Sequence, residues 1–139
     1  MKLLTRTQFR EKVLARNNNN CCVPECPQKA VDAHHILNRN LFTQPDEEGG
    51  YFEENGAQLC SDHHLEAELT FITPEQLRDY CQISNPAIPS ILNPEVQYDC
   101  WGNIVLNEWE IIAGVMFNDE GCQKALKRAN KLWRVKEKA

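Results

Sequence analysis

The pattern of hydrophobic and polar residues predicts a helix close to the N-terminus. The segment Thr5-Arg-Thr-Gln8 fits a capping box, in which two side chains bind the backbone N–H groups of a helix start. Apolar residues then recur at helical spacing, namely Phe9, Val13 and Leu14. The sequence therefore predicts a helix that runs through Arg16.

The next part of the chain predicts two strands followed by a helix. The asparagine run Asn17–Asn20 ends the first helix, and a short hairpin is expected after it. One strand is expected at residues 30–37 and its partner at 51–59, with a Pro- and Gly-containing loop at 43–50 between them. A helix should then run from about Asp62 to about Glu68.

The second half of the chain predicts one more short helix before an irregular segment. Thr73 can cap this helix and Pro74 suits its first turn, so we expect it to run to about Cys81. Residues 86–94 hold three prolines and should be extended and irregular. The segment Trp101-Gly-Asn103 is typical of a turn between short strands.

The segment Asp119–Lys136 predicts an amphipathic helix. Its apolar face consists of Cys122, Leu126, Ala129 and Trp133. The opposite face is basic and consists of Lys124, Lys127, Arg128, Lys131 and Arg134. Such a helix can bind phosphates, lie on a membrane or only expose its charge to water.

Length and composition are those of one small globular domain, residues 1–139, with 42% hydrophobic residues. The net charge of −5 conceals a segregation along the chain. Residues 1–40 hold seven Lys/Arg and three Asp/Glu, so this segment is basic. Residues 41–120 hold one Lys/Arg and sixteen Asp/Glu, and residues 121–139 hold seven Lys/Arg and one Asp/Glu. Basic ends can bind a polyanion locally, although a solvated surface would give the same pattern. No stretch approaches the length of a membrane helix, so no membrane partner is expected.

Cysteine and histidine collect in three short groups, Cys21–Cys26, Asp32–His35 and Asn55–His64. Two cysteines on a turn that contains proline are half of a tetrahedral zinc site, and a second pair some way along the chain completes it. The second pair here is Cys60 and His63. The sequence therefore predicts a structural Zn²⁺ site in this region.

The first half of this zinc site is Cys26 together with Cys21 or Cys22. We favour Cys21, because a four-residue spacer is an ordinary finger knuckle. The alternatives are buried apolar cysteines or disulfides. The start of the chain has no apolar run of a signal peptide, which predicts an intracellular and reducing location and disfavours disulfides.

Three further cysteines have no partner at ligand spacing, and we expect them to be small buried hydrophobic residues: Cys81, Cys100 and Cys122.

A second group of polar residues remains: His34, His35, Asn55 and His64. Neighbouring residues on a strand point to opposite sides, so His34 and His35 cannot easily share one metal ion. One can bind a hard divalent ion while the other, free of metal, acts as a general base on water. A packing or surface role is the alternative for the pair taken alone.

The order of these residues resembles that of the HNH nucleases, a family with a ββα-metal fold. The first motif of that family ends in His-Ile after a metal-binding His or Asp, and this chain reads Asp32-Ala-His34-His35-Ile36. The family's Asn lies on the second strand, nine positions before a metal ligand, as Asn55 precedes His64. Zinc knuckles often bracket the motif; here the second reads Cys60-Ser-Asp-His63-His64, where many members have Cys-x2-Cys-His.

This resemblance covers residues 20–70 and implies an α+β fold. Its centre would be a ββα-metal (His-Me finger) core with a zinc knuckle, flanked by N- and C-terminal helices, and residues 71–139 would form a C-terminal extension. The implied activity is metal-dependent endonucleolytic hydrolysis of phosphodiester bonds in nucleic acid, with DNA favoured over RNA. A basic C-terminal helix would then bind nucleic acid through Lys124, Lys127, Arg128 and Lys131.

The resemblance also implies a role for each residue of the second group. His35 would be the general base, and His34 and His64 would hold one Mg²⁺ or Mn²⁺ ion. Asn55 would hold the loop and orient His35. Glu68 lies one helical turn after His64 and is either a further ligand or an exposed carboxylate. The alternative function is a zinc-stabilised module that binds nucleic acid or protein without cutting.

Overall fold

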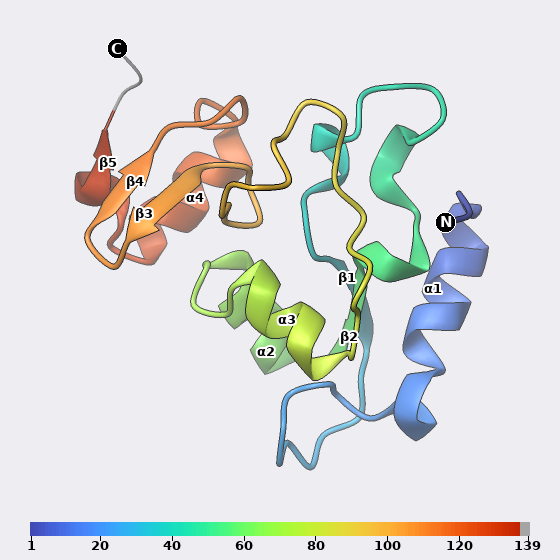
Figure 1. Ribbon diagram of the computed structural model, residues 1–139. Helices are drawn as coiled ribbons and strands as arrows, with labels where there is room; N and C mark the ends of the chain where they lie inside the picture. The colour runs from blue at the N-terminus through green and yellow to red at the C-terminus, as the bar shows by residue number, and fades with distance from the viewer. Residues whose placement is uncertain (137–139) are drawn as a thin grey trace.

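The computed structural model describes residues 1–136, and the last three residues of the expected single domain, 137–139, lie outside this range. The fold is mixed α+β, with four helices and two small sheets in the described residues (Figure 1). The bounds of these elements are α1 Arg6–Leu14, β1 Asp32–His35, β2 Gly56–Leu59, α2 Ser61–Glu68, α3 Pro74–Tyr80, β3 Ile104–Asn107, β4 Glu110–Ile112, α4 Glu120–Arg128 and β5 Val135–Lys136.

Strands β1 and β2 form an antiparallel pair, and α2 begins two residues after β2 ends. The register sets Asp32 opposite Leu59 and His35 opposite Gly56. In Figure 1 α1 runs along one side of this pair, while α2 and α3 lie on the other. The two strands and the helix after them therefore follow the order predicted for residues 30–68.

Helix α1 has the predicted capping box, since Thr5 accepts from the backbone N–H of Gln8 and Gln8 accepts from that of Thr5. Phe9 and Val13 are buried against β2. Gly56 allows this close approach, because a side chain at this position would collide with both residues. The predicted helix at residues 73–81 is also confirmed, with Thr73 as its cap and a proline in its first turn.

The second strand is shorter than the sequence predicts. Residues 51–55 do not pair with β1, and Glu53–Asn55 form a 3₁₀ turn in which the backbone N–H of Asn55 donates to the carbonyl of Phe52. The Asn55 side chain is used for hydrogen bonds to other loops, which favours a bent backbone over a strand at this point. Asn55 therefore precedes β2, and the prediction that it lies on the strand is wrong.

The C-terminal helix is also shorter than predicted, because α4 ends at Arg128 and not at Lys136. Asn130 adopts a left-handed backbone with φ of 58°, and the N–H of Lys131 closes the helix on the carbonyl of Leu126. This bond and the one from the N–H of Asn130 to the carbonyl of Lys127 form a Schellman motif, which ends a helix. The chain then turns back, and β5 pairs in parallel with β4. The predicted basic face is consequently split between a helix and the segment after it.

Candidate functional site

Four side chains converge at the start of α2: Cys21, Cys26, Cys60 and His63. Their ligand atoms all lie within 4.8 Å of one another. The Cys26 and Cys60 sulfurs are 3.9 Å apart, and Nδ1 of His63 lies 3.5 Å from the Cys21 sulfur and 3.2 Å from that of Cys60. Ligands of a tetrahedral zinc ion lie about 3.5–3.8 Å apart. The cluster could therefore hold zinc through three sulfurs and one nitrogen.

The backbone around this cluster is arranged as two knuckles. Cys26 donates its N–H to the carbonyl of Val23, and Glu25 between them has a positive φ of 67°. Cys60 is the N-cap of α2, and its sulfur accepts from the backbone N–H of His63. Amide donors stabilise a thiolate, so this arrangement suits a metal-bound sulfur.

Two electrostatic features of the cluster bear on how it would bind a cation. Burial raises the pKa of the Cys21 thiol to about 11, so this sulfur is neutral at pH 7 without a metal, whereas a coordinating metal deprotonates a thiol. Nε2 of His63 lies 3.5 Å from a carboxylate oxygen of Glu66. A carboxylate on the outer nitrogen orients a metal-binding imidazole and makes it a stronger ligand.

The cluster contains Cys21 and not Cys22. Cys22 is buried in the apolar core beside β2 and α3, and the neighbouring thiol of Cys81 raises its pKa. The sulfur of Cys81 is half-buried and lies 3.6 Å from the Gln58 side chain. Cys100 is buried as predicted, and so is Cys122.

The two adjacent histidines of β1 have different neighbours. His34 is buried, and its ring lies 5.2 Å from the ring of His64. The ring of His35 instead stacks on Phe9 at 4.7 Å and meets the edge of Tyr51 at 5.3 Å. The strand thus separates the pair as its alternation predicts. Nε2 of each histidine is buried and has no hydrogen-bond partner among residues 1–136.

Both rings are held neutral at pH 7. Burial lowers the pKa of His34 to about 3, and the positive charges that His64 and His35 would carry lower it further. Burial also lowers the pKa of His35 to about 4, with smaller contributions from Arg39 and Arg6. The backbone carbonyl of Gly49 accepts a hydrogen bond from the His35 ring and opposes this shift. Each neutral ring can offer a nitrogen lone pair.

His64 lies between two carboxylates. Its Nδ1 is 3.0 Å from Oδ2 of Asp32, and its Nε2 is 3.4 Å from Oε1 of Glu68. A carboxylate only accepts hydrogen bonds, so Asp32 requires the proton on Nδ1 and leaves a lone pair on Nε2. Glu68 then faces that lone pair. This contact is favourable only when a proton or a metal ion lies between the two atoms.

Asn55 is fully buried and connects three backbone segments. Its Oδ1 accepts from the N–H of Leu37 at 3.0 Å, and its Nδ2 donates to the carbonyls of Leu37 at 3.0 Å and Gly50 at 3.2 Å. Gly50 follows Gly49, whose carbonyl binds the His35 ring. The side chain therefore fixes the loop that holds His35.

A cavity of about 500 Å³ opens beside these histidines. His34, His35 and His64 all line it. Three arginines line it as well, and they are Arg6, Arg10 and Arg39. The sequence reasoning missed them because they come from α1 and from the turn after β1, where no basic run marks them. Their position in the +4 segment of residues 1–40 was the available signal.

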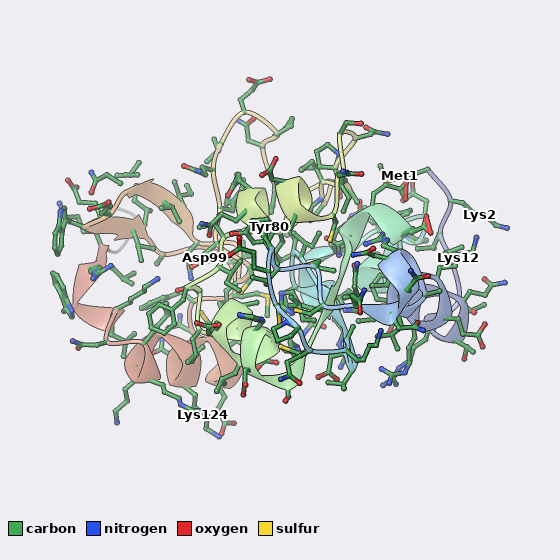
Figure 2. All side chains as sticks on the ribbon, turned by 90° about the horizontal axis from the view of Figure 1, so that it is seen from below. Met1, Lys2, Lys12, Tyr80, Asp99 and Lys124 are labelled. Atoms are coloured by element: carbon green, nitrogen blue, oxygen red, sulfur yellow. The ribbon has the colours of Figure 1, made fainter. Side chains whose placement is uncertain are left out.

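The predicted nucleic-acid residues of the C-terminus lie away from this cavity. Lys124 points outward from α4 (Figure 2) and pairs with Glu120 at 3.0 Å, and Lys127 and Arg128 are also exposed. Lys131 has left the helix, and its Nζ binds the hydroxyl of Thr70 at 2.8 Å and its carbonyl at 3.1 Å. None of these four side chains lines the cavity beside His34 and His35.

Comparisons with family models, curated proteins and solved structures found no match for this chain. Within residues 1–136, no helix has both the length and the apolar character needed to cross a membrane.

Proposed function

We propose that this chain is a metal-dependent HNH-type endonuclease that hydrolyses phosphodiester bonds in nucleic acid. One observation carries the proposal. Two neutral histidines with unpartnered Nε2 atoms lie beside His64 and its two carboxylates, in a cavity edged by arginines. A zinc-stabilised core alone has no use for such a second set. The sequence resemblance supports the same assignment.

His34 and His64 would hold the divalent cation of this reaction, with Glu68 as a carboxylate ligand beside Nε2 of His64. A neutral imidazole and a carboxylate oxygen are suitable donors for Mn²⁺ or Mg²⁺. A bound cation would stabilise the negative charge that develops on the phosphate and on the leaving 3′ oxygen. Asp32 would fix the tautomer of His64 that leaves Nε2 available.

His35 would act as the general base. Its Gly49 contact holds one ring nitrogen, and its unpartnered Nε2 can take a proton from water. The water oxygen then forms a bond to phosphorus, the P–O3′ bond breaks, and the leaving oxygen takes up a proton from solvent. Asn55 would keep the Gly49–Gly50 loop in place, so that the base stays aligned with the water.

Arg6, Arg10 and Arg39 would bind the phosphates on either side of the cleaved bond. The side chains of Arg6 and Arg39 are exposed and have no hydrogen-bond or ion-pair partner among residues 1–136, while the Arg10 side chain donates to the carbonyl of Val31. Arginine suits phosphate because its planar donors can contact two oxygens at once.

The second candidate is a zinc-stabilised binding module that does not cut. The observation in its favour is that the Cys21 group is the one cluster in residues 1–136 whose ligand atoms all lie within 4.8 Å. A plasmid-nicking assay with Mg²⁺, Mn²⁺ and EDTA separates the two functions. We expect cleavage that needs an added divalent ion and is lost in His35→Ala. Absence of cleavage of DNA and RNA with every divalent ion would leave the module.

A further inference from the structure

A second cavity, of about 640 Å³, lies between the connection from α2 to α3 and the sheet of β3 and β4. Phe71 and Trp109 contribute aromatic side chains to its wall, and Lys131 and Arg134 contribute cations. A volume of this size is typical of sites that take a small organic ligand. The proposed reaction uses none of these residues.

Large aromatic rings in the wall of this cavity and next to it are exposed to water. Phe71 is 53% exposed, Trp109 is 60% exposed, and Trp133, whose ring lies 6.3 Å from that of Trp109, is 61% exposed. A small protein gains stability by burying such rings, so three exposed ones in one place mark a binding surface. Their flat faces are suited to a flat, unstacked ligand.

The cations of this surface lie against the same rings. Nζ of Lys131 is 5.0 Å from the centre of the Phe71 ring, and the Arg134 guanidinium is 5.3 Å and 5.1 Å from the rings of Trp109 and Trp133. Nε of Arg134 is buried without a hydrogen-bond partner among the described residues. An aromatic face beside a partly unsatisfied guanidinium matches a ligand that combines a planar ring with an anion.

The acids of this cavity limit how an anion can bind. Glu75, Asp99 and Glu108 also line it, so a polyanion would not be attracted to the whole surface. Attraction for phosphate is confined to the edge formed by Lys131 and Arg134. Affinity should therefore come mainly from stacking on the rings and less from charge.

The position of the cavity connects it to the proposed cleavage site. Cys100 lines both cavities, and the next residue, Trp101, lines the cavity of the histidines. The indole N–H of Trp101 donates to the carbonyl of Glu68 over 3.1 Å, which holds this wall against α2. The two cavities therefore adjoin at residues 100–101.

We propose that the surface formed by Phe71, Trp109 and Trp133 with Lys131 and Arg134 binds unstacked bases of a single-stranded nucleic acid. The bases stack on the aromatic rings, and Arg134 contacts a phosphate between them. This inference rests on the proposed function only in that the same strand reaches the histidine site. Duplex DNA presents no free base faces and does not use this surface.

Fluorescence anisotropy with a labelled single-stranded oligonucleotide tests this surface, with His35→Ala as the parent protein to prevent cutting. We expect Trp109→Ala and Trp133→Ala each to weaken binding about ten-fold or more, in the range of one base–aromatic contact. Trp109→Phe should retain most of the affinity, because a smaller ring still stacks. Ile91→Ala, at an exposed apolar residue outside this cavity, is the matched control and should bind normally.

The salt dependence separates stacking from charge. Arg134→Gln should reduce the slope of log affinity against log salt by about one, whereas the tryptophan variants should leave the slope unchanged. Duplex DNA should bind all these variants equally, and a free mononucleotide should bind much more weakly than the oligonucleotide. Equal oligonucleotide affinity in Trp109→Ala, Trp133→Ala and the parent would overturn the proposal.

Two further outcomes distinguish this proposal from the nuclease assignment. Wild-type protein that never cuts, but binds the oligonucleotide more tightly than its Trp109→Ala variant does, would support the surface and reject the nuclease. Wild-type protein that cuts normally, together with a Trp109→Ala variant that binds the oligonucleotide as tightly as its parent, would support the nuclease and reject the surface. If Trp109→Ala and Trp133→Ala instead convert a dimer into a monomer in sedimentation and leave binding unchanged, the surface is a contact between two copies and the proposal fails.

Discussion

Asn55 donates a hydrogen bond to the backbone carbonyl of Gly50 over 3.2 Å. This bond joins the turn before β2 to the loop whose preceding residue, Gly49, binds His35. The same side chain also binds both backbone polar groups of Leu37, just after β1. A buried amide with three such bonds holds one arrangement of the loops around the candidate base.

Replacing Asn55 with Ala should lower both stability and activity. Three backbone groups would lose their buried partner, and each buried unsatisfied group costs about 1–3 kcal/mol. We expect a clear fall in the free energy of unfolding, measured by urea denaturation, and a loss of cleavage in the fraction that stays folded. The control Asn118→Ala, at an exposed position, should change neither. Normal stability in Asn55→Ala would contradict this account of the loop.

Zinc content is expected to be about one ion per chain, and to depend on Cys21 but not on Cys22. Cys21→Ser should lose most of the metal and much of the stability, because metal affinity in such a site is folding free energy. Cys22→Ser should keep its zinc and show only the cost of a polar group in the core. Elemental analysis and thermal unfolding measure both effects. Well-folded wild-type protein without zinc would reject the site.

The four residues of the candidate zinc cluster could be predicted because their short-range spacing brings them together. Cys60 and His63 share the first turn of α2, and the pair Cys21 and Cys26 share one knuckle. Cys21 could be preferred to Cys22 because the four-residue spacer between Cys21 and Cys26 is usual in a zinc knuckle. The split of His34 from His35 followed in the same way from strand alternation. Most of the candidate site could therefore be predicted from local geometry.

The features that could not be predicted depend on contacts between distant segments. The end of α4 depends on Asn130 in a left-handed conformation, and Lys131 leaves the helix to bind Thr70, sixty-one positions earlier in the chain. Asn55 bends its backbone because its side chain bonds across eighteen positions to Leu37. Periodicity in one segment contains no information on such partners. The arginines of the histidine cavity escaped prediction for the same reason.

Nucleic-acid binding should depend more on the arginines of the histidine cavity than on the exposed face of α4. We expect Arg6→Glu with Arg39→Glu to weaken binding of a His35→Ala protein strongly and to flatten its salt dependence. Lys127→Glu with Arg128→Glu makes the same charge change on exposed residues outside that cavity and is the matched comparison. Equal or greater loss in the α4 variant, measured by anisotropy over a salt series, would assign binding to the C-terminal helix.

Asp32 should affect the divalent ion and not the zinc. Its carboxylate orients His64 through Nδ1, and loss of such an outer contact typically weakens a metal site about 10- to 100-fold. We therefore expect Asp32→Ala to need a higher Mn²⁺ concentration for half-maximal cleavage, with unchanged zinc content. Asp62→Ala removes an exposed carboxylate from the first turn of α2 and is the control. An unchanged Mn²⁺ requirement in Asp32→Ala would remove this role.

The decisive comparison is between His35→Ala and His64→Ala. His35 stacks on Phe9 away from His64, so its loss should leave zinc content and nucleic-acid affinity nearly intact. Cleavage should fall by about 10²–10⁴, because a general base acts on the transition state more than on ground-state binding. His64→Ala should lose activity together with Mn²⁺ binding, and excess Mn²⁺ should restore part of it. If His35→Ala cuts as well as wild type, the base is assigned to the wrong residue and His34 is the first to test.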